Sequence, residues 1–180
     1  PFSFWKQAVD SLRLINTHKL LLLAEGSRSD HYAAGFDYTF GFNFYGGLRG
    51  VFGNGLPATN FDVLNNLEFS GATNGQQVVR YTTNHDINGS DGTPQELYGG
   101  LTGSMSAFIA ASLMKGVPMI YNGQEVGTPY RLTFPFTSAD INWTLNPDLK
   151  AEYKRILAFR NSSAAIRGGT LTSFSSADVL

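Results

Sequence analysis

Short apolar segments that alternate with helical patterns limit most strongly how this chain can fold. Residues 20–24 and 117–121 form apolar runs of five residues, too short for a helix, and residues 78–83 have strong β-propensity. Three other segments carry apolar side chains at helical spacing, namely residues 4–15, 101–113 and 149–160. This alternation is typical of a parallel sheet covered by helices, so we predict an α/β fold.

The remaining segments are assigned with weaker signals. The aromatic stretch at residues 36–40 suggests a short strand, and residues 48–52 and 61–67 have helical patterns. We expect residues 87–94 to form a loop, because Gly, Asp and Pro are frequent there. After a turn at Gly168 and Gly169, residues 170–174 are expected to form a strand outside the alternating pattern.

Polar side chains follow each of the three main predicted strands. Glu25 follows the first, Asn84, His85 and Asp86 follow the second, and Glu125 follows the third. Because the carboxyl ends of parallel strands meet at one edge of a sheet, these groups are expected to converge. Paired carboxylates suit glycoside hydrolysis, with one acting as acid and another as nucleophile or base.

Other interpretations of the same residues remain open. The carboxylates can instead hold a metal ion, with His85 as a nitrogen ligand. Glu25 can be a solvated loop charge, Asp86 can cap a turn, and Glu125 can accept backbone hydrogen bonds. The aromatic residues at 36–45 and Trp5 fit a protein core better than a sugar-binding platform.

Composition excludes several classes of function. The formal net charge is -1, with 13 Lys and Arg against 14 Asp and Glu, and no basic run favours nucleic acid as a partner. The absence of cysteine removes thiol catalysis and thiolate metal sites. No apolar stretch approaches the roughly 18 residues of a membrane span. A surface with few charges and many polar and aromatic residues suits neutral ligands such as sugars.

Three motifs resemble the α-amylase family, glycoside hydrolase family 13. Residues 81–86, Tyr-Thr-Thr-Asn-His-Asp, resemble its strand-seven motif, and residues 23–26, Leu-Ala-Glu-Gly, resemble its strand-five motif. Residues 116–127 resemble its strand-eight segment, which is long and highly specific. Residues 81–91 and this last segment are most similar to starch-utilisation α-amylases of gut Bacteroidetes.

The resemblance implies a fold and a division of the chain. Residues 1–163 would form the second half of a (β/α)8 TIM barrel, about strands 5–8, and residues 164–180 would begin a C-terminal β-sandwich domain. Glu25 matches the general acid/base of the family and Asp86 matches the carboxylate that stabilises the transition state. His85 and Asn84 would bind substrate, whereas Gln124 and Glu125 match structural positions.

One part of the family pattern is missing. The family nucleophile is an Asp in a Gly-x-Arg-x-Asp motif at the end of strand four, and we expect this motif to be missing from the chain. We expect the nucleophile in a segment before Pro1, together with the N-terminal half of the barrel. The chain would then be a fragment of a retaining hydrolase of α-1,4-glucans, such as starch or maltooligosaccharides, and inactive alone.

The resemblance leaves alternatives and further expectations. The parent enzyme can instead act on α-1,6 bonds or transfer glycosyl groups, since loops set linkage specificity. A non-catalytic carbohydrate-binding homologue is a second alternative, against which the retention of Glu25 and Asp86 argues. We expect no cofactor or metal within this chain, calcium as an option in the parent, and a location outside the cytoplasm.

Overall fold

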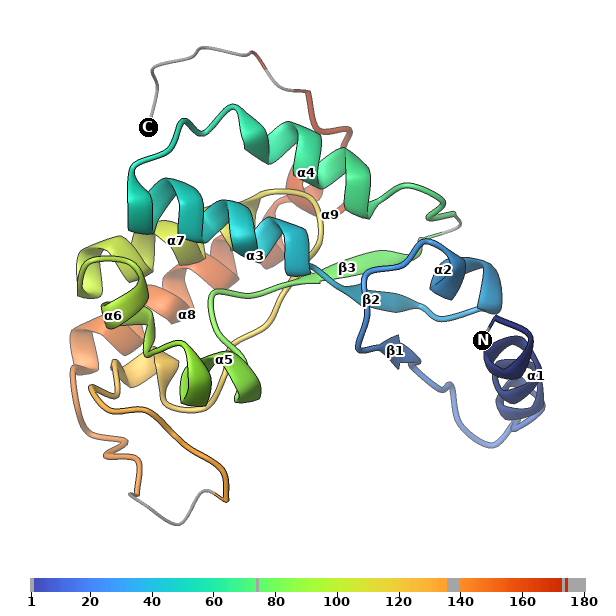
Figure 1. The fold of residues 1–180 in the computed structure, drawn as a ribbon, viewed down its shortest axis with the longest axis horizontal. Helices are drawn as coiled ribbons and strands as arrows, with labels where there is room; N and C mark the ends of the chain where they lie inside the picture. Colours follow the sequence, from blue (N-terminus) through green and yellow to red (C-terminus); the bar gives the residue numbers. More distant parts are fainter. Residues whose placement is uncertain (1, 74, 136–139, 173, 175–180) are drawn as a thin grey trace.

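The computed structural model describes residues 2–73, 75–135, 140–172 and 174, and within them a parallel sheet of four strands organises the chain. The strands are β1 (Leu23–Ala24), β2 (Tyr38–Phe40), β3 (Gln77–Arg80) and β4 (Val117–Pro118), and they lie side by side in chain order. Each neighbouring pair is parallel, so the carboxyl ends of the strands share one edge of the sheet (Figure 1 labels β1, β2 and β3). The predicted α/β class is therefore confirmed.

Helices connect and cover these strands. In the described part of the chain they are α1 (Phe2–Arg13), α2 (Asp30–Ala34), α3 (Phe42–Leu48), α4 (Asn60–Glu68), α5 (His85–Ser90), α6 (Pro94–Leu97), α7 (Leu101–Leu113), α8 (Pro147–Ser162) and α9 (Ala164–Gly168). A π-helical turn (Arg49–Gly53) continues α3, and a 3-10 turn (Gln124–Val126) follows β4. None of these helices is both long enough and apolar enough to cross a membrane.

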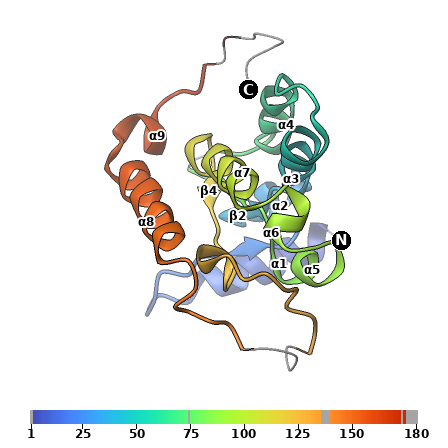
Figure 2. The ribbon, with the colours of Figure 1, turned by 90° about the vertical axis from the view of Figure 1, so that its left-hand side faces the viewer.

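The largest cluster of buried apolar side chains joins the sheet to α3 and α7. Phe40 of β2 and Val79 of β3 pack with Phe44 of α3 and with Ala107 and Ala111 of α7, all at most 8% exposed. Figure 2 shows α7 between α3 and α8, and α8 adds a smaller cluster around Phe108 and Tyr153. The core therefore holds the helical layer against β2 and β3.

A buried ion pair fixes the same region. Arg80, the last residue of β3, pairs with Glu68 of α4, and its Nη2 donates to Asn65 Oδ1 at 2.8 Å. The Glu68 Oε1 atom in turn accepts hydrogen bonds from the backbone N–H groups of Asn43 and Phe44, at 2.7 and 3.0 Å. This network ties β3 and α4 to the first turn of α3, because buried charges require such partners.

The register of β1 against β2 is fixed by Asp37. Leu23 lies opposite Tyr38, and Ala24 opposite Thr39. The Asp37 Oδ2 atom accepts a hydrogen bond of 2.7 Å from Leu22 N, and Asp37 N donates to Leu22 O at 2.8 Å. A salt bridge of 2.8 Å from Arg13 holds the same carboxylate, so α1 also contributes to the position of β1.

The strands are shorter than the sequence suggests. The run at residues 20–24 pairs only at Leu23 and Ala24, and Leu21 and Leu23 are 65% and 41% exposed rather than buried on both faces. In the described residues β1 pairs with β2 on one side only, which explains this exposure. Likewise, β3 ends at Arg80 and β4 at Pro118.

Two other expectations fail in the described residues. Residues 87–94 are not a simple loop, because α5 extends to Ser90 and α6 begins at Pro94. Residues 170–172 and 174 form no strand, and residues 173 and 175–180 lie outside the described residues. The start of a β-sandwich at 164 stays a prediction, with the short helix α9 at that point of the chain.

Candidate active site

Three polar side chains from two strand ends meet at the carboxyl edge of the sheet. Glu25 follows β1 directly, and His85 and Asp86 are the first two residues of α5, which four residues separate from the end of β3. Because β2 lies between β1 and β3, the site spans three neighbouring strands. Figure 1 shows α5 leaving the sheet at the edge where β1 also ends.

Asn84 determines where α5 begins. Its Oδ1 atom accepts hydrogen bonds from Asp86 N at 3.1 Å and from Ile87 N at 2.8 Å, which is an N-cap. The residue is only 2% exposed. Asn84 therefore holds the first turn of α5, which carries His85 and Asp86, and any contact with a substrate would come from its side-chain nitrogen.

The imidazole of His85 lies against both carboxylates. Its Nε2 atom is 3.4 Å from Glu25 Oε1 and 3.5 Å from Asp86 Oδ1. One ligand atom from each of the three residues lies within 4.8 Å of the others. The side chains of Glu25, His85 and Asp86 are 53%, 49% and 74% exposed, so a ligand from solvent reaches all three.

This arrangement permits two kinds of chemistry. A carboxyl group, an imidazole and a second carboxylate can bind sugar hydroxyls and transfer a proton to a glycosidic oxygen. The same three groups can hold a metal ion such as Zn²⁺, since His nitrogen and carboxylate oxygen are its usual ligands. The geometry thus keeps both interpretations of the sequence open.

The expectation that the chain lacks a Gly-x-Arg-x-Asp motif is wrong, because this spacing occurs at residues 26–30, although not at the position that the family pattern requires. It follows Glu25 instead of preceding it, and Asp30 begins α2. The Arg28 side chain pairs with Asp30 and lowers the pKa of its carboxyl group. Asp30 lines a small pocket with Trp5 and His31, so this spacing supplies no carboxylate to the Glu25 cluster.

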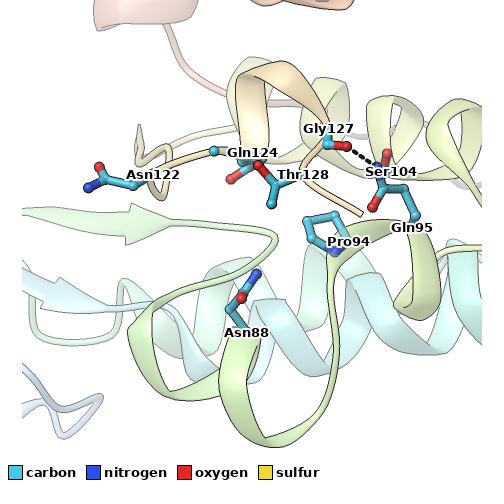
Figure 3. A pocket seen from close by; sticks show the side chains of 9 residues that line it. Asn88, Pro94, Gln95, Ser104, Asn122, Gln124, Gly127 and Thr128 are labelled. Carbon is cyan, nitrogen blue, oxygen red and sulfur yellow. Dashed lines mark hydrogen bonds between the residues drawn. The ribbon is translucent and has the colours of Figure 1, made fainter. Parts of the chain in front are cut away.

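Gln124 is a structural residue of the segment after β4, as the sequence suggests. Its side-chain nitrogen donates to Thr82 Oγ1 at 2.7 Å and to Tyr153 Oη at 3.1 Å. It also lines a polar cavity with Asn88 and Thr128 (Figure 3). With a volume of about 10 Å³, this cavity is far too small for a sugar.

Glu125 does not join the carboxylate cluster. It lies in the 3-10 turn after β4, and its Oε2 atom is buried without a hydrogen-bond partner among the described residues. The cluster at the sheet edge contains Glu25, His85 and Asp86 instead. The three predicted strand ends therefore contribute unequally, with two of them supplying the candidate site.

An aromatic cluster lies under the same edge. Tyr81 is 1% exposed and contacts Phe40 and Tyr45, with ring centroids 5.3 and 5.5 Å apart. Burial raises the pKa of the Tyr81 hydroxyl. Phe42 belongs to this cluster but is 39% exposed. The sequence favours a core position for these aromatic residues and for Trp5, which is wrong in part for Phe42 and for Trp5, itself 44% exposed.

Comparisons with known proteins locate the fold. No family model matches the sequence, and no curated protein matches it. Among solved structures, cyclic α-maltosyl-(1→6)-maltose hydrolase from Arthrobacter globiformis aligns over 99% of this chain and 42% of its own, with a TM-score of 0.81 and 20% identity. The chain has the fold of part of an α-amylase-type glycoside hydrolase.

Other solved amylases agree with this assignment of the fold. The α-amylase from Lactobacillus plantarum aligns with a TM-score of 0.74 and 18% identity over 94% of this chain and 43% of its own. The maltogenic α-amylase AmyB from Thermotoga neapolitana aligns with a TM-score of 0.63 and 20% identity over 93% and 38%. The chain therefore spans about two fifths of the length of the structures that it matches.

Proposed function

We propose that the chain is the part of a retaining α-glucan hydrolase that carries its general acid/base. In this proposal it supplies about strands 5–8 of a (β/α)8 barrel and begins the C-terminal β-sandwich at residue 164. The amylase-type fold and the three motifs support the assignment. The remaining part of the barrel, including the nucleophile, would come from a segment that precedes Pro1.

The observation that carries the proposal is the meeting of Glu25, His85 and Asp86. The glutamate and the aspartate are 61 positions apart in the chain, yet one ligand atom from each lies within 4.8 Å of the other. Strand ends bring such groups together in barrel enzymes, where active sites lie at the carboxyl ends of the strands. A purely structural role would not require three exposed polar groups to converge.

Each residue has a role in the proposed reaction. Glu25, protonated, donates its proton to the glycosidic oxygen as the bond to the leaving sugar breaks, while the nucleophile forms a covalent bond to the anomeric carbon. The Glu25 carboxylate then takes a proton from water, which attacks that carbon and releases the nucleophile. Asp86 stabilises the positive charge of the transition state, and His85 and Asn84 bind hydroxyl groups of the same sugar.

Glucose polymers are the substrate class that we propose. The matched structures include the Arthrobacter globiformis hydrolase in complex with maltose and with cyclic α-maltosyl-(1→6)-maltose. We propose α-1,4 bonds as the bonds cleaved, with α-1,6 hydrolysis, glycosyl transfer or simple carbohydrate binding as alternatives. A location outside the cytoplasm, and calcium in the rest of the protein, belong to the same proposal.

The proposal is tested with the chain and with a version extended by its upstream coding sequence. We expect the 180-residue chain to bind maltoheptaose without cleaving it, and the extended protein to release shorter oligosaccharides. In the extended protein, Glu25→Gln should lower kcat by roughly 10²-fold or more and leave maltoheptaose binding intact, because only proton transfer is removed. Unchanged turnover in this variant would contradict the acid/base role.

Product analysis separates the alternatives. An α-1,4 hydrolase releases maltose and maltotriose from maltoheptaose, whereas an α-1,6-acting enzyme requires a substrate that contains α-1,6 bonds, such as pullulan. A transferase also produces oligosaccharides longer than the substrate. A carbohydrate-binding homologue binds maltoheptaose but leaves it intact even in the extended protein, and that result would overturn the enzymatic assignment.

A further inference from the structure

Phe42 is a partly exposed aromatic side chain at the same edge of the sheet as Glu25, His85 and Asp86. It stands two residues after the end of β2, and β2 lies between β1 and β3. Phe40 N donates to Gly26 O at 2.9 Å, so the segment before Phe42 runs directly beside the one that carries Glu25. Phe42 therefore belongs to the strand end between the two that supply the polar cluster.

The backbone at Phe42 is held firmly. Gly41 N donates to Val79 O of β3 at 2.9 Å, which fixes the residue before it. On the other side, the buried Glu68 carboxylate accepts hydrogen bonds from Asn43 N and Phe44 N. Phe42 is the first residue of α3 between these two anchors, so its position is preorganised.

The ring of Phe42 is supported from one side and open on the other. Its ring centroid lies 5.7 Å from that of Phe40 and 6.3 Å from that of Tyr81. The planes of the Phe42 and Tyr81 rings meet edge-to-face, at an angle of 83°. Phe40 and Tyr81 are 5% and 1% exposed, whereas Phe42 remains 39% exposed. A flat apolar surface with a rigid support is suited to contact the C–H face of a sugar ring, because aromatic rings contribute large contact areas at little entropic cost.

We propose that Phe42 stacks on a glucose ring of the bound α-glucan and positions it beside Glu25, His85 and Asp86. The polar cluster binds hydroxyl groups, and the aromatic ring supplies the apolar contact that those groups lack. Phe42 is thus a positioning residue and takes no part in proton transfer. The inference rests on the proposed function, since it requires that the site binds an α-glucan.

The test measures maltoheptaose binding to the 180-residue chain by isothermal titration calorimetry. Phe42→Ala should weaken binding roughly tenfold, the effect expected when the apolar contact of one aromatic face is lost. Phe42→Trp should bind within about threefold of the original chain, because it restores a flat ring. Phe159→Ala removes a ring that is 56% exposed on α8, away from the strand ends, and should leave the affinity unchanged.

A second variant separates binding from folding. Phe42→Leu keeps an apolar side chain against Phe40 and Tyr81 but lacks a ring, so we expect weaker binding with an unchanged melting temperature. Equal affinities for the original chain, Phe42→Ala and Phe42→Leu would overturn this inference and leave the proposed function standing. If the original chain binds no α-glucan, the proposed function itself fails, and the inference with it.

Discussion

The Arg80 guanidinium and the Glu68 carboxylate form an ion pair whose side chains are 0% and 1% exposed. Arg80 also donates from Nε to Lys115 O at 3.1 Å and stacks over the Phe44 ring at 4.0 Å. Every charged atom of this pair thus has a nearby partner, as burial of charge demands. Because Arg80 ends β3, the pair fixes the point from which the chain continues to His85 and Asp86.

Breaking this pair should strongly destabilise the protein. We expect Arg80→Met to lower the free energy of unfolding by about 3–5 kcal/mol, because it leaves the Glu68 carboxylate buried without its counter-ion. Urea denaturation followed by circular dichroism measures the change. Arg155→Met is the matched control: its partner Glu152 is exposed, so a change of at most about 1 kcal/mol is expected. Equal effects of the two substitutions would contradict the assigned role of Arg80.

A second prediction concerns Asn84, the N-cap residue of α5. Asn84→Ala removes the acceptor for Asp86 N and Ile87 N and should cost about 1 kcal/mol of stability, whereas Asn84→Asp preserves a good cap. Thermal denaturation gives the stability, and hydrogen exchange at the amides of residues 86 and 87 shows whether the cap is lost. If these amides exchange no faster in Asn84→Ala, the cap does not hold the first turn.

Tyr153 should make stability depend on alkaline pH. Burial raises the pKa of its hydroxyl to about 12, while the unfolded value is about 10. A raised pKa in the folded state means that this contribution is complete below about pH 10 and is lost as the pH rises towards 12. Two pKa units correspond to roughly 3 kcal/mol, and Tyr153→Phe should remove this contribution. Urea denaturation between pH 9 and 11.5 gives the free energy of unfolding of the original protein and of Tyr153→Phe at each pH. Identical slopes of this free energy against pH in the two proteins would contradict the prediction.

The sequence predicts the long, periodic elements well. The predicted helix at residues 101–113 coincides with α7, and the one at 149–160 lies within α8, because apolar side chains recur over several turns in both. Glu25, His85 and Asp86 could be selected because they follow β-rich segments, although their roles stay predictions. The parallel sheet follows from the alternation of strands and helices.

The sequence pattern does not predict the short helix α5. The helix α5 has six residues and depends on a cap from Asn84, so it shows no apolar period, and Gly89 and Gly92 made its region resemble a loop. The exposure of Phe42 could not be predicted either, because the sequence does not distinguish it from Phe40 and Phe44. These two nearby residues are also phenylalanines, but they are buried. One of the rings that Phe42 contacts is Tyr81, the residue after β3, which lies about 40 positions further along the chain.

Asp37 allows a further prediction, far from the polar cluster. Asp37→Ala removes the acceptor for Leu22 N and the partner of Arg13, and should cost about 1–3 kcal/mol. Asp37→Asn retains an acceptor but loses the charge, so a smaller loss is expected. Urea denaturation of both variants measures the difference. A loss in Asp37→Asn as large as that in Asp37→Ala would show that charge, and not the hydrogen bond to Leu22, dominates.

The pairing that Asp37 secures has a consequence for the site. Only two residues of β1 pair with β2, and a shift of one residue would turn the Glu25 side chain to the opposite face of the sheet. The general acid/base candidate thus owes its orientation to a carboxylate at the other end of the strand. In a mutational scan for activity, position 37 should therefore behave like a residue of the active site without touching the substrate.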